Sequence, residues 1–277
     1  SAAPAIEDGT AHFQTIAEWS GNSSSQTVSQ TGNSGFTPDW AIIKSKSFGN
    51  GANSYDVVRG GNKGLATFDN GAEDTESDGV TFGISSDKGT LAFTGAGASG
   101  DINNSGRTYC AWTWKAGDSN TVVSESGTGD DAIAACTHRA NQTAGFSIVK
   151  YQGKNDEISN GEHTKVAHGL GVKPTLIIGK NLAAGNDWFV MSIPQQNDAH
   201  IHLNTTAANV GSDFTGTWSD SDATHFVVGN DDLVNKAGAD YISYVFAEIP
   251  GYSKFGSYKG NGSSSTPPFV HLGFKPQ

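Results

Sequence analysis

The chain has 277 residues and a formal net charge of −11, with 17 Lys and Arg against 28 Asp and Glu. Because the basic residues are few and not clustered, the sequence argues against a nucleic-acid partner. It contains no apolar stretch of the roughly 18 residues that a membrane helix needs, so no membrane insertion is expected.

The composition predicts an all-β fold. There are 36 Gly residues, and only 16% of the chain is charged, which is unusual for a protein rich in amphipathic helices. Short runs of β-branched and aromatic residues alternate with clusters of Gly, Asn, Ser and Asp. This alternation is typical of antiparallel β-sandwiches.

In chain order, residues 1–11 are expected to form an irregular N-terminal arm, and residues 12–117 a first β-sandwich module. The strands of this module are predicted at 13–19, 40–44, 55–60, 80–84, 91–93 and 109–115. The polar segment 118–144 is expected to be a linker that holds at most a short strand at 132–136.

A second β-sandwich module is predicted over residues 145–250, and residues 251–277 are expected to begin a third. The strands of the second module are predicted at 145–151, 175–180, 188–193, 200–204, 225–229 and 241–249.

An internal repeat supports this division. Residues 36–44 recur as residues 172–180, and the last residues, 272–277, match the start of the same motif. The interval is as long as a whole domain, which indicates tandem modules rather than a solenoid. The third copy breaks off at Gln277, so its remainder is expected either from later residues or from a partner chain.

Each copy of the motif places a proline before a predicted strand, at Pro38, Pro174 and Pro276. Proline cannot donate to a β-ladder, so it suits the first residue of a strand. The glycine three residues earlier suits a turn with positive φ. These glycines are Gly35, Gly171 and Gly273.

The strands that close the two modules have matching faces, because alternate side chains share one side of a strand. The large, mostly apolar face is predicted to pack against a second sheet. In the first module it carries Cys110, Trp112 and Trp114, and in the second Ile242, Tyr244 and Phe246.

Two cysteines, Cys110 and Cys136, are present. Cys110 corresponds to Ile242 in the second module, which favours a buried free thiol. A disulfide between the two cysteines is the alternative.

The sequence as a whole resembles a family of phage proteins. The runs at 35–44, 54–60, 106–117, 145–151 and 246–262 resemble tandem modules of uncharacterised structural and appendage proteins of tailed phages, many of them marine or cyanobacterial. The resemblance extends from about residue 12 to the end of the chain. It implies jelly-roll modules of the concanavalin or SPRY type in tail fibres, appendages and other surface structures. It implies no catalytic residues.

Two histidines on one predicted strand, His200 and His202, have a spacing that can hold a metal, with Asp198 nearby. The favoured interpretation is nevertheless a pair of solvent-facing side chains on a half-exposed strand. His168 precedes a Gly-Leu-Gly turn, and a turn hydrogen bond is favoured there over catalysis.

Three acidic runs lie in predicted loops. Their carboxylates could bind calcium or form a glycosidase acid/base pair, but turn formation is the commoner use of Asp. The runs contain Asp130, Asp131, Asp220, Asp222, Asp231 and Asp232.

Aromatic residues such as Trp19, Tyr55 and Trp218 could stack on sugar rings, but packing in the core or the linker is the favoured interpretation for each. Asp56 and Arg59 would face opposite sides of a regular strand, so a direct ion pair between them requires a turn or bulge.

Taken together, these features predict a non-enzymatic structural protein of a phage particle, located on the tail or capsid surface and binding no cofactor. Its expected partners are other virion proteins, further copies of itself and a host-surface glycan. The alternatives are a lectin-like or glycan-degrading protein and a bacterial surface adhesin. No coiled-coil heptads are present to specify the oligomeric state.

Overall fold

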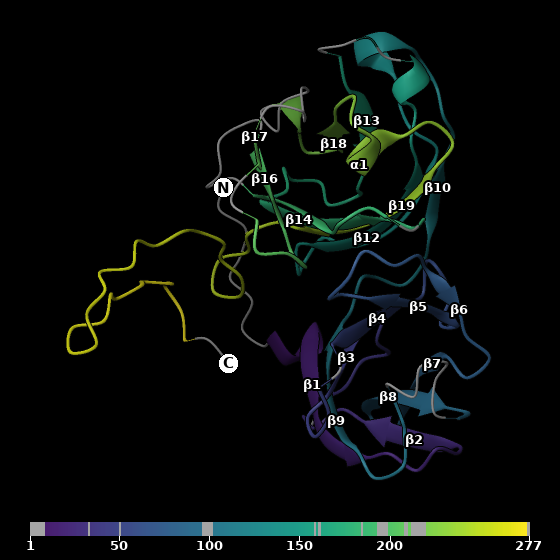
Figure 1. Ribbon diagram of the computed structural model, residues 1–277, viewed down its shortest axis with the longest axis vertical. Helices are drawn as coiled ribbons and strands as arrows, with labels where there is room; N and C mark the ends of the chain where they lie inside the picture. The colour runs from purple at the N-terminus through teal and green to yellow at the C-terminus, as the bar shows by residue number, and fades with distance from the viewer. Residues whose placement is uncertain are drawn as a thin grey trace.

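The computed structural model describes residues 9–32, 34–49, 51–95, 102–157, 159, 162–183, 185–192, 199–207, 210–211 and 220–275. The prediction of an all-β protein is confirmed, since 42% of the chain is strand and 6% helix, in antiparallel sheets of which none closes into a barrel. Two units lie one above the other, joined to an extended C-terminal tail (Figure 1). We call them the N-terminal unit (residues 9–117), the C-terminal unit (residues 118–253) and the tail (residues 254–275).

The N-terminal unit contains a six-stranded and a three-stranded sheet, with strand orders β1-β9-β3-β4-β5-β6 and β2-β8-β7. Its core includes residues of both sheets, as expected for a β-sandwich, among them Ile16, Leu91 and Tyr109. The elements are η1 (Gly9–Ala11), β1 (Phe13–Ser20), β2 (Gln26–Ser29), β3 (Trp40–Ser45), β4 (Ala52–Asp56), β5 (Lys63–Ala66), β6 (Asp74–Thr75), β7 (Val80–Ser85), β8 (Lys88–Phe93) and β9 (Thr108–Trp114).

The C-terminal unit is built around an eight-stranded sheet, β10-β11-β12-β19-β14-β15-β16-β17, and a two-stranded sheet, β13-β18. Its core lies between these sheets and includes Val166, Phe226 and Val245. The elements are β10 (Thr121–Val123), η2 (Gly129–Asp131), β11 (Cys136–Asn141), β12 (Phe146–Gln152), η3 (Asn155–Glu157), β13 (Thr164–Ala167), β14 (Leu176–Asn181), β15 (Phe189–Ser192), β16 (Ala199–His202), β17 (Val210–Gly211), β18 (His225–Val228), α1 (Asp232–Asn235) and β19 (Asp240–Phe246).

The sequence repeat corresponds to a repeated strand arrangement. In the N-terminal unit, β9 lies between β1 and β3, and Trp114 pairs with both Phe13 and Trp40. In the C-terminal unit, β19 lies between β12 and β14, and its last residue, Phe246, pairs with Phe146 and Leu176 in the same way. The strand that follows the repeated proline therefore has the same neighbours and register in both units.

Two of the three glycines before the prolines have the predicted positive φ, namely Gly171 and Gly273. Gly35 does not, and its requirement is steric: a side chain there would collide with the backbone of Lys88.

The predicted linker is the main correction to the domain division. β11 pairs with β12 over its whole length, and β10 pairs with β11, so both strands belong to the large sheet of the C-terminal unit. Ala132, Ala134 and Cys136 are buried there. The polar composition that suggested a linker belongs to the turns between these strands, whereas their pairing partners lie later in the chain.

The closing strands also differ from prediction. In β9 the buried face is the one that carries Tyr109, Ala111 and Thr113, while Trp112 on the other face is 38% exposed. In β19 both faces are buried, because Tyr241 lies in the core of the C-terminal unit and Tyr244 lies in a core shared by both units. The predicted apolar face thus packs outside its own sandwich, or remains exposed.

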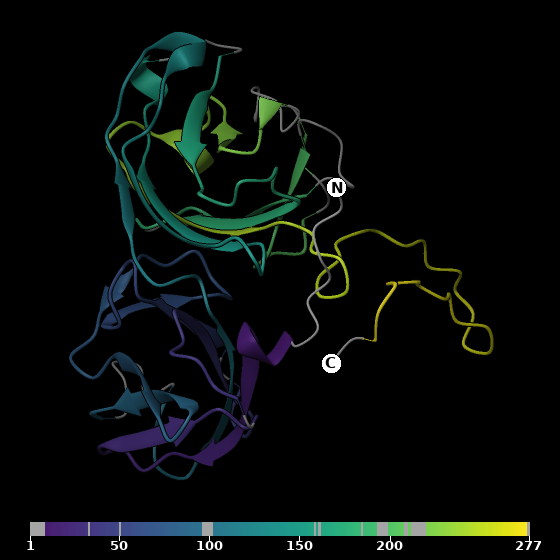
Figure 2. The same ribbon diagram turned by 180° about the vertical axis from the view of Figure 1, so that it is seen from behind.

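The tail contains no strand among its described residues, and it extends away from both units (Figures 1 and 2). Phe269 is 88% exposed, and Tyr258 is also exposed. The described residues of the predicted third module, 251–275, therefore form no strand, although Ser253 makes an isolated β-bridge with Ile249. Among the described residues, no helix is long and apolar enough to cross a membrane.

Candidate functional site

A shared aromatic core joins the two units. The Trp40 ring of β3 stacks on Tyr244 of β19 at 4.0 Å between ring centroids and on Trp114 at 4.3 Å. It also stacks on Phe146 of β12 at 5.5 Å. From the C-terminal unit, Trp188 donates its indole N–H to the carbonyl of Ala66 at 2.8 Å. The two large sheets thus pack against each other through ring contacts rather than through a flexible connection.

Beside these rings lies a buried polar network. The Tyr244 hydroxyl donates to Asp56 Oδ2 at 2.9 Å and lies 2.8 Å from Ser54 Oγ, which also accepts the indole N–H of Trp40. Arg59 Nε lies 2.5 Å from Asp56 Oδ2, and neither side chain is exposed. Burial raises the pKa of the Tyr244 hydroxyl, which therefore stays protonated. All polar groups of the network are paired, so the charges are tolerated in the core.

The turn required for an Asp56–Arg59 ion pair is present. β4 ends at Asp56, whose Oδ1 accepts the backbone N–H groups of Val58 at 3.0 Å and Arg59 at 2.8 Å. The chain therefore turns back, and the Arg59 side chain returns to the same carboxylate. Its guanidinium also reaches Glu73 at 3.2 Å.

A second ion pair crosses between the units, from Asp39 in the N-terminal unit to Arg139 of β11. Arg139 Nε lies 2.9 Å from Asp39 Oδ1, and Asp39 Oδ2 accepts the backbone N–H of Ala116 at 2.8 Å. Burial raises the pKa of the Asp39 carboxyl to about 6, despite the opposing effect of Arg139. This ion pair joins β11, a strand within the predicted linker, to the N-terminal unit.

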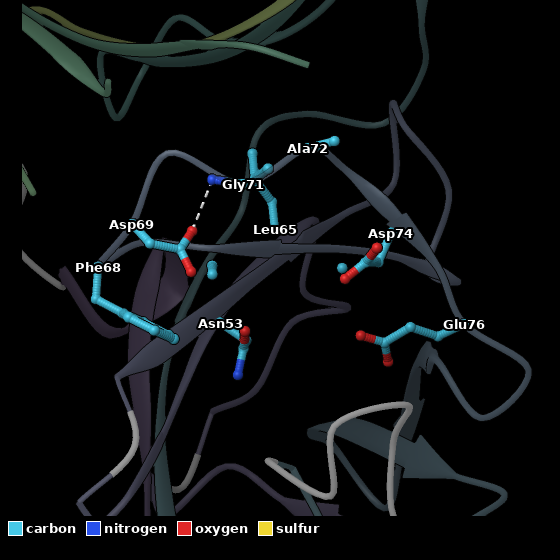
Figure 3. Close-up of a pocket in the computed structure, with 10 residues that line it drawn as sticks. Asn53, Leu65, Phe68, Asp69, Gly71, Ala72, Asp74 and Glu76 are labelled. Atoms are coloured by element: carbon cyan, nitrogen blue, oxygen red, sulfur yellow. Dashed lines mark hydrogen bonds between the residues drawn. The ribbon is translucent and has the colours of Figure 1, made fainter. Parts of the chain in front are cut away.

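The candidate binding site is an acidic pocket of the N-terminal unit, shown in Figure 3. It has a volume of about 260 Å³ and is formed by β4, β5, β6 and the loop between β5 and β6. Its acidic side chains are Asp69, Asp74 and Glu76, and no Lys or Arg is among the described residues that line it. The pocket residues are Asn53, Gly64, Leu65, Ala66, Phe68, Asp69, Gly71, Ala72, Asp74 and Glu76.

Contacts around the pocket hold two of its carboxylates in place. Glu76 is buried, and both of its carboxylate oxygens accept from the Tyr55 hydroxyl at 2.9 Å. A side chain at Gly64 would occupy the position of this carboxylate. Asp69 Oδ1 accepts the backbone N–H of Gly71 at 2.9 Å, the dashed line in Figure 3.

Asn53 contributes an amide group to the pocket. It is 9% exposed, and its side-chain amide has no hydrogen bond to any residue that the structure describes. Its side chain lies between Phe68 and Glu76 (Figure 3). Buried amides are normally paired, so the pocket offers an open donor and acceptor beside its carboxylates.

The sequence did not identify this pocket, and the aromatic residues proposed for sugar stacking do not supply it. Trp19 is 6% exposed and stacks on Phe93 and Tyr109, while Tyr55 is 1% exposed beneath Glu76. Neither presents a ring face to a ligand. Core packing, the favoured interpretation, is therefore confirmed for both, and sugar stacking by them is wrong. Trp218 lies outside the described residues.

The histidine pair forms a partly buried chain of contacts. His200 Nε2 lies 3.1 Å from His202 Nε2, and His202 Nδ1 lies 3.0 Å from Asp187 Oδ2. His200 is buried, which contradicts the expectation of two solvent-facing histidines. Within the described part of the chain, no three or more His, Cys, Asp or Glu side chains are grouped so as to hold a metal. Asp198 lies outside that part.

The other predicted candidates make local contacts. His168 Nδ1 accepts the Leu170 N–H at 3.1 Å, which confirms the turn hydrogen bond, and burial lowers the pKa of His168 to about 4. Asp231 caps α1 through Leu233 N–H. Asp222 accepts from Thr224 and His225, and mainly the Thr224 hydroxyl lowers the pKa of Asp222 to about 2.

The remaining acidic residues form surface ion pairs. Asp131 lies 3.2 Å from Lys165 Nζ, and Asp232 lies 3.4 Å from Lys236 Nζ. Asp130 and Asp220 lie 3.4 and 4.0 Å from His163 Nδ1.

Both cysteines are free, so the disulfide alternative is wrong. Cys136 is buried as expected, and burial raises the pKa of its thiol to about 11. Cys110 is only half-buried, because its face of β9 is not covered.

These features define an all-β protein of two tightly joined units with an acidic pocket on one of them. The chain belongs to the family described as a domain of unknown function, DUF7483, which matches residues 8–277 and so includes both units. Comparisons with curated proteins and with solved structures find no match.

Proposed function

We propose that this protein is a non-enzymatic structural component of a tailed-phage particle, exposed on its tail or capsid. Each unit is a jelly-roll β-sandwich of the concanavalin type, and the tandem units present a rigid surface to the outside. The proposal is supported by the sequence resemblance to phage appendage proteins and by the repeated strand arrangement of the two units.

The observation that carries the proposal is the core shared by the units. Trp40, Tyr244 and the buried Asp56–Arg59 pair fix one unit on the other. Such a junction holds the two sandwiches in a constant orientation, which suits a part that transmits position or force. Arg59, Tyr244 and His168 are among the ionisable groups whose pKa values are shifted strongly. Each forms hydrogen bonds inside the fold, and none of the three lines the acidic pocket.

The acidic pocket favours a role in host attachment. Multiple copies on a particle, together with other virion proteins, would let weak single contacts with a host-surface glycan add up through avidity. A lectin-like activity is therefore the second function that we consider. A glycan-degrading activity or a bacterial adhesin has no specific observation in its favour.

The test is the location of the chain. Mass spectrometry of purified phage particles should detect it at a fixed copy number, and an electron cryo-microscopy map should show its paired sandwiches on the tail or capsid surface. If the chain is abundant in infected cells but absent from purified particles, the proposal is wrong. Incubation of the purified protein with host surface polysaccharide should release no reducing ends.

A further inference from the structure

We propose that the acidic pocket of the N-terminal unit binds one sugar ring that carries hydroxyl or amino groups and no negative charge. The ring would lie between Phe68 and Asp69 on one side and Asp74 and Glu76 on the other, with Asn53 between them (Figure 3). The volume of about 260 Å³ suits a ligand the size of a single ring, below the range usual for drug-sized molecules.

The chemistry of the lining selects the ligand class. Ionised carboxylates only accept hydrogen bonds, and three of them, Asp69, Asp74 and Glu76, line the pocket. A ligand must therefore bring several donors, as the hydroxyl groups of a neutral sugar or the ammonium group of an amino sugar do. Since the described lining contains carboxylates and no Lys or Arg, a uronic acid or a phosphorylated sugar would be repelled.

Asn53 is the second, independent observation. The residue is 9% exposed, and its side-chain amide lines the pocket without a hydrogen bond to any described residue. A ligand hydroxyl can both accept from this amide and donate to it. The unpaired amide thus marks the position where a ligand would bind.

Phe68 supplies the apolar side of the pocket. Its ring packs against the backbone of Gly51, where any side chain would displace it, and the residue remains 46% exposed. The negative face of an aromatic ring suits the C–H groups on one face of a sugar ring. Glu76 is held by Tyr55 at 2.9 Å, so the acceptors are positioned before a ligand arrives.

A divalent cation fits the pocket less well, although three carboxylates line it. Calcium requires six to eight oxygen ligands converging on one point. Within the described residues, no three carboxylate, histidine or cysteine side chains are grouped closely enough to hold a metal. The acceptors are spread around the cavity instead, which matches the spread of hydroxyl groups around a ring (Figure 3).

This inference rests on the proposed role of the pocket in glycan attachment and names its ligand class. It is tested separately, because sugar binding is measured on the purified full chain whether or not the chain belongs to a particle. The experiment is an NMR titration of that chain with glucose, galactose, mannose, glucosamine and glucuronic acid. At least one neutral or amino sugar should bind with a Kd on the order of millimolar, and glucuronic acid about tenfold more weakly. Calcium chloride and spermidine are titrated alongside as cation probes.

Two variants test the pocket, each with a matched control. Asn53→Ala and Phe68→Ala should each weaken sugar binding about tenfold. Phe48→Ala removes an equally exposed ring that lies against Arg107, and Asp131→Asn changes a surface carboxylate outside the pocket, so both should bind as the unmodified chain does. Circular dichroism and thermal unfolding verify that each variant is folded. Because Phe68 is half-exposed, its variant keeps the test valid if Asn53→Ala fails to fold.

The inference is overturned by any of three results. The first is the absence of binding by every neutral and amino sugar at millimolar concentrations. The second is equal binding by glucuronic acid. The third is equal affinity of Phe68→Ala and Phe48→Ala. Binding of calcium or spermidine without any sugar would also contradict it and would identify the pocket as a cation site. Particle proteomics is independent of all these outcomes.

Discussion

Tyr244 and Trp112 occupy equivalent positions in the two units, each opposite an isoleucine of the neighbouring strand. Tyr244 is buried against the other unit, whereas Trp112 is 38% exposed. The strand register is thus the same in both units, while the burial of the matching face depends on what packs against it. In the C-terminal unit that face is covered by Trp40 and by the network around Asp56. In the N-terminal unit, only the Trp114 end of the matching face of β9 is covered, where Trp114 stacks on Trp40.

The largest effect should come from the buried member of this pair. Tyr244→Ala removes a buried ring and its hydrogen bonds, so we expect the free energy of unfolding to fall by about 5 kcal/mol. Trp112→Ala should lower it by less than about 1 kcal/mol, since the ring lies on the surface. Chemical denaturation followed by circular dichroism measures both. Equal losses would show that the two faces are not used differently.

Loss of the buried Asp56–Arg59 ion pair beside Tyr244 should destabilise the chain almost as much. Arg59→Met leaves the Asp56 carboxylate buried and without its charge partner, which should reduce the free energy of unfolding by about 4 kcal/mol. Adding Asp56→Asn should restore part of that loss. As a matched control, Lys46→Met breaks an exposed pair with Glu18 and should change stability little. If Arg59→Met were as stable as Lys46→Met, the network would not hold the units together.

His168 should make the stability of the C-terminal unit depend on pH, whereas Gln30 at the matching place in the N-terminal unit does not titrate. His168 follows β13 as Gln30 follows β2, and each accepts a backbone N–H in its turn. Burial lowers the pKa of His168 to about 4, below its ordinary value, so the unfolded chain binds the proton more readily. Stability should therefore decrease as the pH falls through about 6.5, by about 2 kcal/mol between pH 7 and 5. His168→Gln, which copies the N-terminal unit, should remove this dependence.

Titration of Asp39 should change stability with pH in the direction opposite to that of His168, and by a smaller amount. Its pKa is raised to about 6, so the folded chain binds the proton more readily than the unfolded chain. The contribution of Asp39 to stability is present at low pH and is lost as the pH rises through about 6, by about 1 kcal/mol between pH 5 and 7. Urea denaturation of Asp39→Asn beside the unmodified chain isolates this contribution. The opposite slope would mean that Arg139 controls the carboxylate.

The sequence predicts those parts of the fold that depend on local pattern. The repeat, the strand after each proline and the closing strands are all evident from residue order. β2 and β13 were missed, because short polar strands such as Gln26–Ser29 do not differ from loops in composition. The segment with β10 and β11 resembles a linker for the same reason, because its attachment to the large sheet, through the pairing of β11 with β12, is not evident from composition.

The candidate site was less predictable than the fold. An exposed and a buried tryptophan have the same sequence signature, so Trp19 and Tyr55 were proposed as surface rings although both are buried. Phe68, Asp69 and Glu76 are close in sequence, but Asn53 joins them only through the pairing of β4 with β5. The run from Phe68 to Glu76, which holds four acidic residues and one aromatic ring, is the signal that could have indicated the pocket.

The most direct test of the shared core is native-state hydrogen exchange of the full chain, read separately for β9 and β19. Because the two strands lie on either side of this core, they should open together, with equal free energies of opening close to the global value. Tyr244→Ala should separate the two values. If β9 and β19 open with clearly different free energies in the unmodified chain, the units are independent domains and the account of a single rigid pair is wrong.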